Sequence, residues 1–98
     1  MTLGQKIKEL RESQSMLQRQ LAAKLEIGDG YLCKIEHNQK VIKREHLKSI
    51  SKIFNYPLEE LESLWVATKV YELVKDEEYA LSALKVAENH VKYYRKQK

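Results

Sequence analysis

The segment from residue 18 to residue 37 constrains the fold of this chain more than any other feature. Apolar residues recur along it every three or four positions, as on one face of a helix, but Glu26-Ile27-Gly28 interrupts the period. The period resumes at Tyr31, so the pattern predicts two short helices joined by a tight turn. The residues expected to fill the wedge between them are Leu21, Leu25, Ile27, Leu32 and Ile35, with the small Ala22 at the helix crossing.

Further helices are predicted on both sides of this pair. Residues 2–5, Thr-Leu-Gly-Gln, have the form of a capping box, in which a hydroxyl and an amide satisfy free backbone N–H groups, and they start a helix over 3–13. Residues 15–18, Ser-Met-Leu-Gln, repeat that form before the second helix. Asn38 is suited to end the third helix in a left-handed conformation, and an apolar stripe predicts a fourth helix over 44–54.

The second half of the chain predicts two longer helices. Asn55 ends the fourth helix, and Pro57 stands at the start of the fifth, where its missing N–H costs nothing. Residues 58–75 carry apolar side chains around most of the circumference, so this helix must be covered on more than one side. Acidic residues 76–78 begin a sixth helix with an apolar seam for another helix. The seam spans only about two heptads, which favours a packed hairpin over a long coiled coil.

The composition excludes several classes of protein. Ninety-eight residues suffice for one small domain with a helical arm, and three glycines and one proline are too few for a many-stranded sandwich, so the predicted fold class is all-α. The single cysteine forms no internal disulfide. No apolar run approaches the roughly 18 residues that a membrane span needs, and residues 1–4 lack the plan of a signal peptide. We expect a soluble, cytoplasmic protein without a membrane partner.

Charge is unevenly distributed along the chain. Residues 1–57 carry 11 Lys/Arg against 6 Asp/Glu, whereas residues 58–91 carry 3 against 8. Four more basic residues lie among residues 92–98, so basic, acidic and basic blocks follow one another. A polyanionic partner would bind the first basic block, residues 1–57. Alternatively, the charged side chains only keep a small protein solvated. The motifs must decide between these two interpretations.

The residue pattern resembles the helix-turn-helix proteins of the Cro and phage-repressor type, the XRE family. The resemblance covers residues 3–61 and rests on Gln18, Leu21, Ala22, Leu25, Ile27, Tyr31, Leu32, Lys34, Ile35, Glu36, Leu47, Ile50, Phe54, Leu58 and Leu61. It implies a five-helix bundle like that of lambda repressor, followed here by one additional C-terminal helix. It also implies that the helix over residues 28–36 enters the major groove of double-stranded DNA, leading with its N-terminal residues.

The resemblance also assigns roles to individual residues. It places Asp29, Gly30 and Lys34 toward the bases, and the chemistry of Tyr31 makes that residue a fourth candidate. The candidates for contact with the DNA backbone are Gln18, Arg19, His37, Asn38, Gln39, Lys40, Lys43 and Arg44. Gln18 matches a glutamine that touches phosphate and braces the first base contact. Arg11 and Glu36 match the buried ion pair of the family.

The base-facing candidates differ in what they can recognise. Lys34 can donate to guanine O6 or N7, and Asp29 can accept from the N4 amine of cytosine, each contact contributing about 1–3 kcal/mol of discrimination. Asp29 can instead stabilise the N-terminus of its own helix. Tyr31 can touch a thymine methyl or a phosphate, or serve as a half-buried packing residue. Gly30 has no side chain with which to recognise a base. It either allows the protein backbone to approach the DNA closely, or it is simply a residue that the turn accommodates.

Three positions depart from the family pattern. Glu26 stands where glycine is usual, and a positive φ there costs about 1 kcal/mol unless the turn is slightly reshaped. Leu17 replaces the usual Ser/Thr cap before the glutamine, which makes Ser15 a candidate cap one turn earlier. Gly28, a weaker cap than serine, opens the recognition helix.

Residues 62–98 extend beyond the predicted DNA-binding domain at residues 1–61. A Trp-containing helix followed by the segment 76–88 looks like small controller-like regulators associated with restriction–modification DNA methyltransferases. Such proteins bind as dimers to paired half-sites and activate or repress their operons. We expect a homodimer with two recognition helices about 34 Å apart, one DNA turn. The residues expected to divide between core and dimer interface are Leu64, Trp65, Val70, Tyr71, Leu84, Ala87, Val91 and Tyr94.

The main alternative is an antitoxin-like module that binds a second protein through its acidic C-terminal half and also represses its operon. Antitoxins keep a segment that is disordered when free, whereas residues 58–94 have strong helical periodicity. Cys33 and His37 share a helix face but are too few for a zinc site. Residues 28–30 lack the third glycine of a nucleotide-binding loop, and catalytic motifs are missing, so neither a cofactor nor enzymatic activity is expected. The basic residues 92–98 are more typical of a solvated tail than of a phosphate contact.

Overall fold

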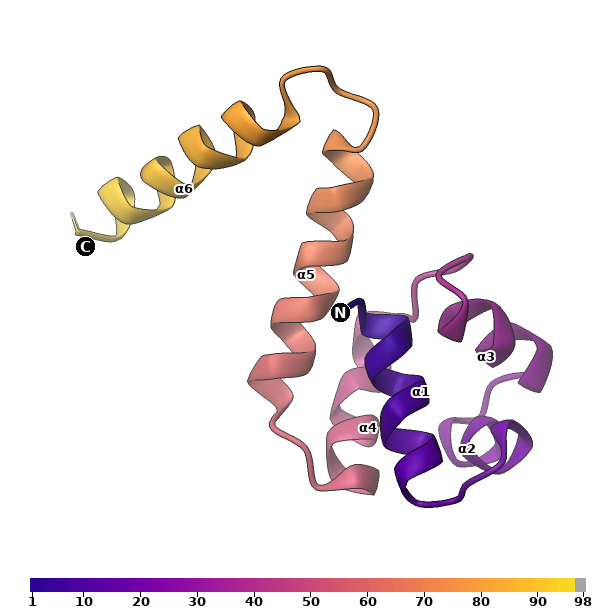
Figure 1. Ribbon diagram of the computed structural model, residues 1–98. Coiled ribbons are helices and arrows are strands. Elements are labelled where there is room, and N and C mark those ends of the chain that lie inside the picture. Colours follow the sequence, from indigo (N-terminus) through magenta and orange to yellow (C-terminus); the bar gives the residue numbers. More distant parts are fainter. Residues whose placement is uncertain (97–98) are drawn as a thin grey trace.

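The structure is a computed structural model that describes residues 1–96, and the described part of the chain contains six α-helices and no strand (Figure 1). The helices are α1 (Leu3–Ser13), α2 (Gln18–Leu25), α3 (Asp29–Glu36), α4 (Leu47–Phe54), α5 (Leu58–Val74) and α6 (Ala80–Lys96), with a 3-10 turn, η1 (Arg44–His46), before α4. The first five α-helices form a bundle, and α6 projects from it. The predicted all-α fold, a five-helix bundle with one additional helix, is therefore confirmed.

The helix starts follow local hydrogen bonding, with one correction to the prediction. The capping box of α1 is present: the Gln5 N–H donates to Thr2 Oγ1 at 3.1 Å, and the Thr2 N–H donates to Gln5 Oε1 at 2.9 Å. The prediction that Ser15 caps α2 was wrong, because the N-cap of α2 is Leu17. Instead, Ser15 takes a positive φ of 52°, and its N–H closes the end of α1. The Leu17 N–H is satisfied by Gln20 Oε1 at 2.8 Å.

Besides α1, which Ser15 follows, three more helices have a residue with a positive φ at or just after their end. Asn38 (φ 63°) follows α3 and Asn55 (φ 50°) ends α4, as the sequence predicts for these residues. At the end of α2, Glu26 takes the same conformation with a φ of 57°. The turn therefore keeps its shape without glycine and carries the cost of about 1 kcal/mol that a side chain adds there.

The core is built where α2 and α3 meet α1, α4 and the start of α5. Four of the five predicted wedge residues are buried and Ile27 is partly buried, and Ala22 is buried at the helix crossing. Gly4 completes this packing, although the sequence did not single it out. A Cβ on Gly4 would collide with the carbonyl oxygen of Ile35 and lie 2.7 Å from Asn38 Oδ1. A glycine is therefore required where α1 crosses the end of α3.

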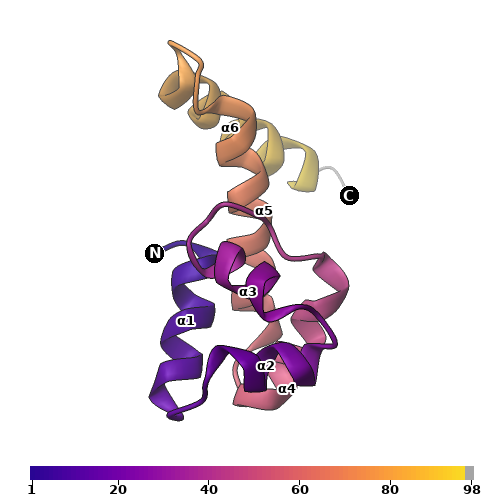
Figure 2. The ribbon, with the colours of Figure 1, turned by 90° about the vertical axis from the view of Figure 1, so that its right-hand side faces the viewer.

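The C-terminal half of the molecule leaves the core. Leu61 is the only buried residue of α5, and the outer part of that helix exposes apolar side chains up to Leu73, which is 78% exposed. The predicted hairpin of the last two helices was wrong: α6 has no buried residue and leaves α5 on the side away from α1 and α3 (Figure 1 and Figure 2). The connection over residues 75–79 includes the acidic residues expected to begin α6, and it turns the chain away from α5.

The expected boundary between residues 61 and 62 falls inside α5, so the DNA-binding part and the extension share one continuous helix.

Among the helices over residues 1–96, none combines the length and the apolar character that crossing a membrane requires.

Candidate nucleic-acid interface

The α2–turn–α3 unit presents α3 at the outer edge of the bundle, away from α5 and α6 (Figure 1 and Figure 2). The inner face of α3 contributes Leu32 and Ile35 to the core. Asp29, Gly30 and Lys34 lie exposed on the remaining surface. The helix therefore has one buried face that fixes it and a polar face that is open to a ligand.

A buried ion pair fixes α3 against α1. Arg11 Nε donates to Glu36 Oε2 at 2.7 Å, and Arg11 Nη2 donates to Glu36 Oε1 at 3.0 Å, so the contact is bidentate. The third donor, Arg11 Nη1, reaches the carbonyl oxygen of Met16 at 2.8 Å. The hydrogen bonds to Glu36 raise the pKa of Arg11 above its ordinary value. This charged group therefore ties together α1, the connection before α2, and α3.

Gln18 is attached to the same ion pair. Its Nε2 donates to Glu36 Oε1 at 2.9 Å from the first position of α2, and its side chain is partly buried. Because the Glu36 side chain is 0% exposed and is held by Arg11, the Gln18 amide lies in a fixed position. Its remaining polar atoms are suited to contact a phosphate or to brace a neighbouring base contact, the role that the resemblance implies.

The first turn of α3 combines structural and accessible groups. Gly28 is the N-cap and has no side chain to satisfy the turn, so Asp29 Oδ1 accepts from the Gly30 N–H at 3.1 Å. Asp29 thus stabilises its own helix, one of its two predicted roles. A Cβ on Gly30 would meet nothing within 4 Å, so the fold does not require a glycine there. Tyr31 is partly buried against the core and directs its hydroxyl toward the Val41 carbonyl at 3.4 Å, which favours its packing role.

The loop after α3 carries most of the candidates for backbone contact. His37, Asn38, Gln39, Lys40 and Lys43 are exposed there, and Arg19 is exposed on α2. Arg44 differs, because its Nε donates to Glu62 Oε2 at 2.6 Å and its guanidinium lies 5.0 Å from the centre of the Trp65 ring. Its side chain is therefore engaged with α5, and a phosphate must compete with this carboxylate.

Trp65 anchors the loop to α5. Its indole Nε1 donates to the carbonyl oxygen of Ile42, a buried residue, at 2.8 Å. Trp65 and Leu64 both pack against the core, so these two interface candidates belong to the bundle. The other candidates are accessible: Leu84 is partly exposed, and Val70, Tyr71, Ala87, Val91 and Tyr94 are exposed. No local sequence signal links Trp65 to Ile42, which is 23 residues away.

Cys33 and His37 occupy neighbouring positions on α3, as their spacing predicts. The distance from Cys33 Sγ to His37 Nδ1 is 3.7 Å, and the same ring nitrogen lies 2.8 Å from the Cys33 carbonyl oxygen. The residues that the structure describes contain no group of three or more potential metal-ligating side chains. The geometry gives the imidazole a helix-capping contact.

Comparison with known families bears on the role of this surface. A family model described as a helix-turn-helix domain matches residues 4–72, more than two thirds of the chain. The chain belongs to this helix-turn-helix family. The family is one of DNA-binding regulatory domains, which supports DNA binding by this helix-turn-helix protein. Neither a curated protein nor a solved structure matches the chain. The matched region includes most of α5, beyond the segment on which the sequence resemblance rests.

Proposed function

We propose that the protein is a sequence-specific transcriptional regulator that binds a two-fold symmetric operator as a homodimer. The observation that carries this proposal is the exposed polar face of α3, which the buried pair of Arg11 and Glu36 holds in one orientation. A rigid helix with its N-terminal half open to solvent is what major-groove docking requires. The resemblance to controller-like regulators supports control of the protein's own operon or of an adjacent, restriction–modification-like operon.

Base recognition is assigned to the exposed residues of α3. Lys34 donates to guanine, and the free oxygen of Asp29 accepts from cytosine while its partner oxygen holds the Gly30 N–H. Because Gly30 has open space around its Cα, it lets the helix approach the bases closely. Tyr31 contributes less to recognition than these residues, since its hydroxyl is directed toward the Val41 carbonyl.

Positioning on the duplex is assigned to the surrounding polar groups. Gln18 contributes an amide at the start of α2, and the loop after α3 contributes Lys40 and Lys43. Such groups bind phosphates and fix the register without reading sequence. The basic end of α6 carries Lys92, Arg95 and Lys96, whereas Lys98 lies outside the described residues. We propose that this tail lies on the protein surface and does not contact the DNA.

Self-association is supported by the apolar side chains that α5 and α6 leave uncovered. Val70, Tyr71, Val91 and Tyr94 are each at least 37% exposed, and residues 80–96 form a helix rather than an irregular segment. An ordered helix with an apolar face is suited to a second copy of the chain, whereas the antitoxin interpretation calls for a segment that folds on a partner protein. We therefore place the dimer interface on these two helices.

The decisive experiment selects duplexes that the full-length protein binds from a random pool and maps the protected bases. We expect a two-fold repeated motif whose half-sites are one helical turn apart. Lys34→Ala should relax base preference at one position of each half-site, and Lys43→Ala should weaken all sequences alike. Absence of any enriched motif, or equal losses for both variants on specific and random duplexes, would contradict the assignment.

Salt dependence provides an independent measurement of the backbone contacts. If the dimer neutralises about 6–10 phosphates, affinity should fall by about 10³–10⁵ between 50 and 200 mM salt. A chain truncated after Tyr94 should keep the same slope, because the tail is assigned to the protein surface away from the DNA. A flatter slope for that truncated chain would show that residues 95–98 contact the DNA.

A further inference from the structure

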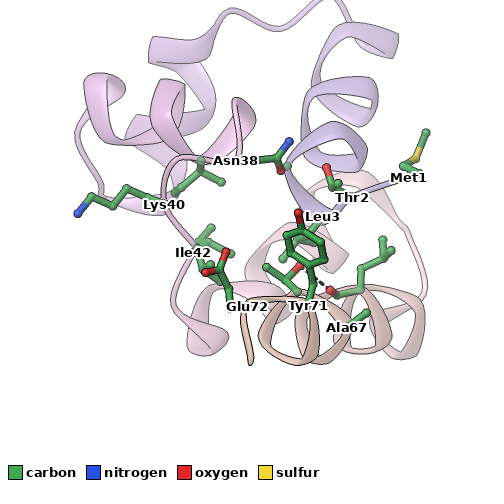
Figure 3. Close-up of a pocket in the computed structure, with 14 residues that line it drawn as sticks. Met1, Thr2, Leu3, Asn38, Lys40, Ile42, Ala67, Tyr71 and Glu72 are labelled. Atoms are coloured by element: carbon green, nitrogen blue, oxygen red, sulfur yellow. Dashed lines mark hydrogen bonds between the residues drawn. The ribbon is translucent and has the colours of Figure 1, made fainter. Parts of the chain in front are cut away.

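An apolar groove with a volume of about 420 Å³ separates the start of α1 from the middle of α5. Its third side is the loop that follows α3 (Figure 3). Ala67 and Tyr71 line the α5 side and lie opposite Leu3 and Ile42. Glu72 stands at the rim, whereas Lys40 points away from the groove. The groove is therefore apolar along its length and carries an acidic group on its α5 edge.

The helix that lacks a partner in this structure is α6. Its apolar residues cover about half of the circumference in two adjacent stripes, one with Leu84, Ala87, Val91 and Tyr94, the other with Val86 and Tyr93. Tyr79, which precedes the helix, continues the second stripe. Tyr94 is 62% exposed and no residue of α6 is buried. A 17-residue helix is only marginally stable without tertiary packing, so its apolar face must be covered by another surface.

We infer that the groove of one protomer receives α6 of a second copy of the chain, so that the two protomers exchange their last helices. The molecule's own α6 does not cover the groove, because it leaves α5 on the opposite side from α1 and the loop after α3. The inference rests on the homodimer of the proposed function and names the surfaces that form it. In this arrangement Val91 and Tyr94 pack against Ala67 and Tyr71.

Charge complementarity sets the direction of the exchanged helix. The acidic group at the groove is Glu72, which pairs with Lys75 at 3.1 Å, and acidic residues 76–78 follow just beyond the end of α5. The segment 72–78 therefore carries four acidic residues against one lysine. The last turn of α6 is basic, and Arg95 follows Val91 by four residues, on the same side of the helix. Running α6 with its basic end toward this acidic segment joins opposite charges, and Arg95 then shares Glu72 with Lys75. The reverse direction would bring its basic end toward the basic N-terminal half of the protein.

This arrangement links dimerisation to the DNA-binding surface. The loop that borders the groove contributes Asn38, Lys40 and Val41, and the same loop carries proposed phosphate contacts. A helix seated in the groove packs directly against that loop and holds it in place. Loss of α6 should therefore weaken binding even to a single half-site, beyond the loss caused by separating two half-sites.

The experiment mixes two full-length variants in a Cys33→Ser background, one with Ala67→Cys and the other with Tyr94→Cys, under mild oxidation. The expected product is a mixed disulfide of dimer mass. A chain carrying both cysteines that forms the bond internally, at monomer mass, would overturn the inference in favour of an α6 that folds back on its own groove. A stable dimer that binds its operator but forms no mixed disulfide would overturn the inference and leave the proposed function intact.

A charge exchange tests the same arrangement without crosslinking. Glu72→Lys and Arg95→Glu should each weaken dimerisation about fivefold, and the two together should restore it. Glu12→Lys is the control, because it makes the same charge change at an exposed position of α1 that does not line the groove. Tyr94→Ala should weaken dimerisation about 30-fold, whereas Leu81→Ala, which removes an 84% exposed side chain outside both stripes, should have little effect. Additive losses in the double charge variant, or equal effects of Tyr94→Ala and Leu81→Ala, would refute the exchange.

Discussion

The buried pair of Arg11 and Glu36 offers the sharpest test of how this fold is held together. Replacing Arg11 by Met removes two of the three hydrogen bonds that Glu36 receives and leaves its carboxylate with Gln18 alone. The Glu36 side chain is 0% exposed, so water cannot take the place of the guanidinium. Removal of one partner of a buried ion pair lowers the free energy of unfolding by about 3–5 kcal/mol. This is a large part of the 5–15 kcal/mol that stabilises a typical domain.

The variants Arg11→Met, Glu36→Met and the double Arg11→Met/Glu36→Met should be compared by urea unfolding and by circular dichroism. In a domain of this size about 3 kcal/mol corresponds to a fall in Tm of at least ~12 °C. The double variant should be more stable than either single variant, because it leaves no unpaired charge in the core. A single Arg11→Met substitution that costs less than about 1 kcal/mol would refute the argument, since it would show that the site is hydrated.

Three further predictions concern individual positions in the bundle. Gly4→Ala should destabilise the fold by about 1–3 kcal/mol in urea unfolding, because its Cβ meets the backbone of α3, whereas Gly30→Ala should stabilise it by about 0.5–1 kcal/mol and weaken DNA binding in the same preparation. A gain of stability for Gly4→Ala would contradict the packing of α1 on α3, and a loss for Gly30→Ala would contradict the open space around that residue. Glu26→Gly should raise stability by up to about 1 kcal/mol by relieving the positive φ, and Glu26→Gln, which removes only the charge, should not. Trp65→Phe should cost about 1–3 kcal/mol, measured by circular dichroism, because it leaves the Ile42 carbonyl without its indole donor; an unchanged stability would mean that another group replaces that bond.

The parts of the fold that the sequence predicts are those with local causes. The helix periods, the capping box at Thr2 and the left-handed ends at Asn38 and Asn55 each depend on residues within a few positions of one another. The wedge between α2 and α3 is predictable for the same reason, since a tight turn leaves its two apolar faces only one way to meet. Glu26 shows that a local preference is overridden when the surrounding packing fixes the turn.

The parts that the sequence did not predict depend on contacts between distant segments. Trp65 reaches Ile42 across 23 positions, and Arg44 reaches Glu62 across 18. Gly4 is required only because α1 crosses α3 at that point, and a glycine near a helix start gives no sign of such a crossing. The apolar seam of α6 indicated that the helix needs a partner but not which surface supplies it, which is why the hairpin was predicted in error.

The site also shows why a charged pair occupies two positions at which a pair of apolar residues would stabilise the fold equally well. Arg11 and Glu36 determine the angle of α3 through directional bonds, and Glu36 also receives Gln18, the residue proposed to face the DNA backbone. An apolar replacement would keep the helices packed but leave the Gln18 amide without an orienting acceptor. We therefore expect the double variant Arg11→Met/Glu36→Met to recover its stability but not its affinity for the selected operator. Recovery of both would show that the pair serves the fold alone.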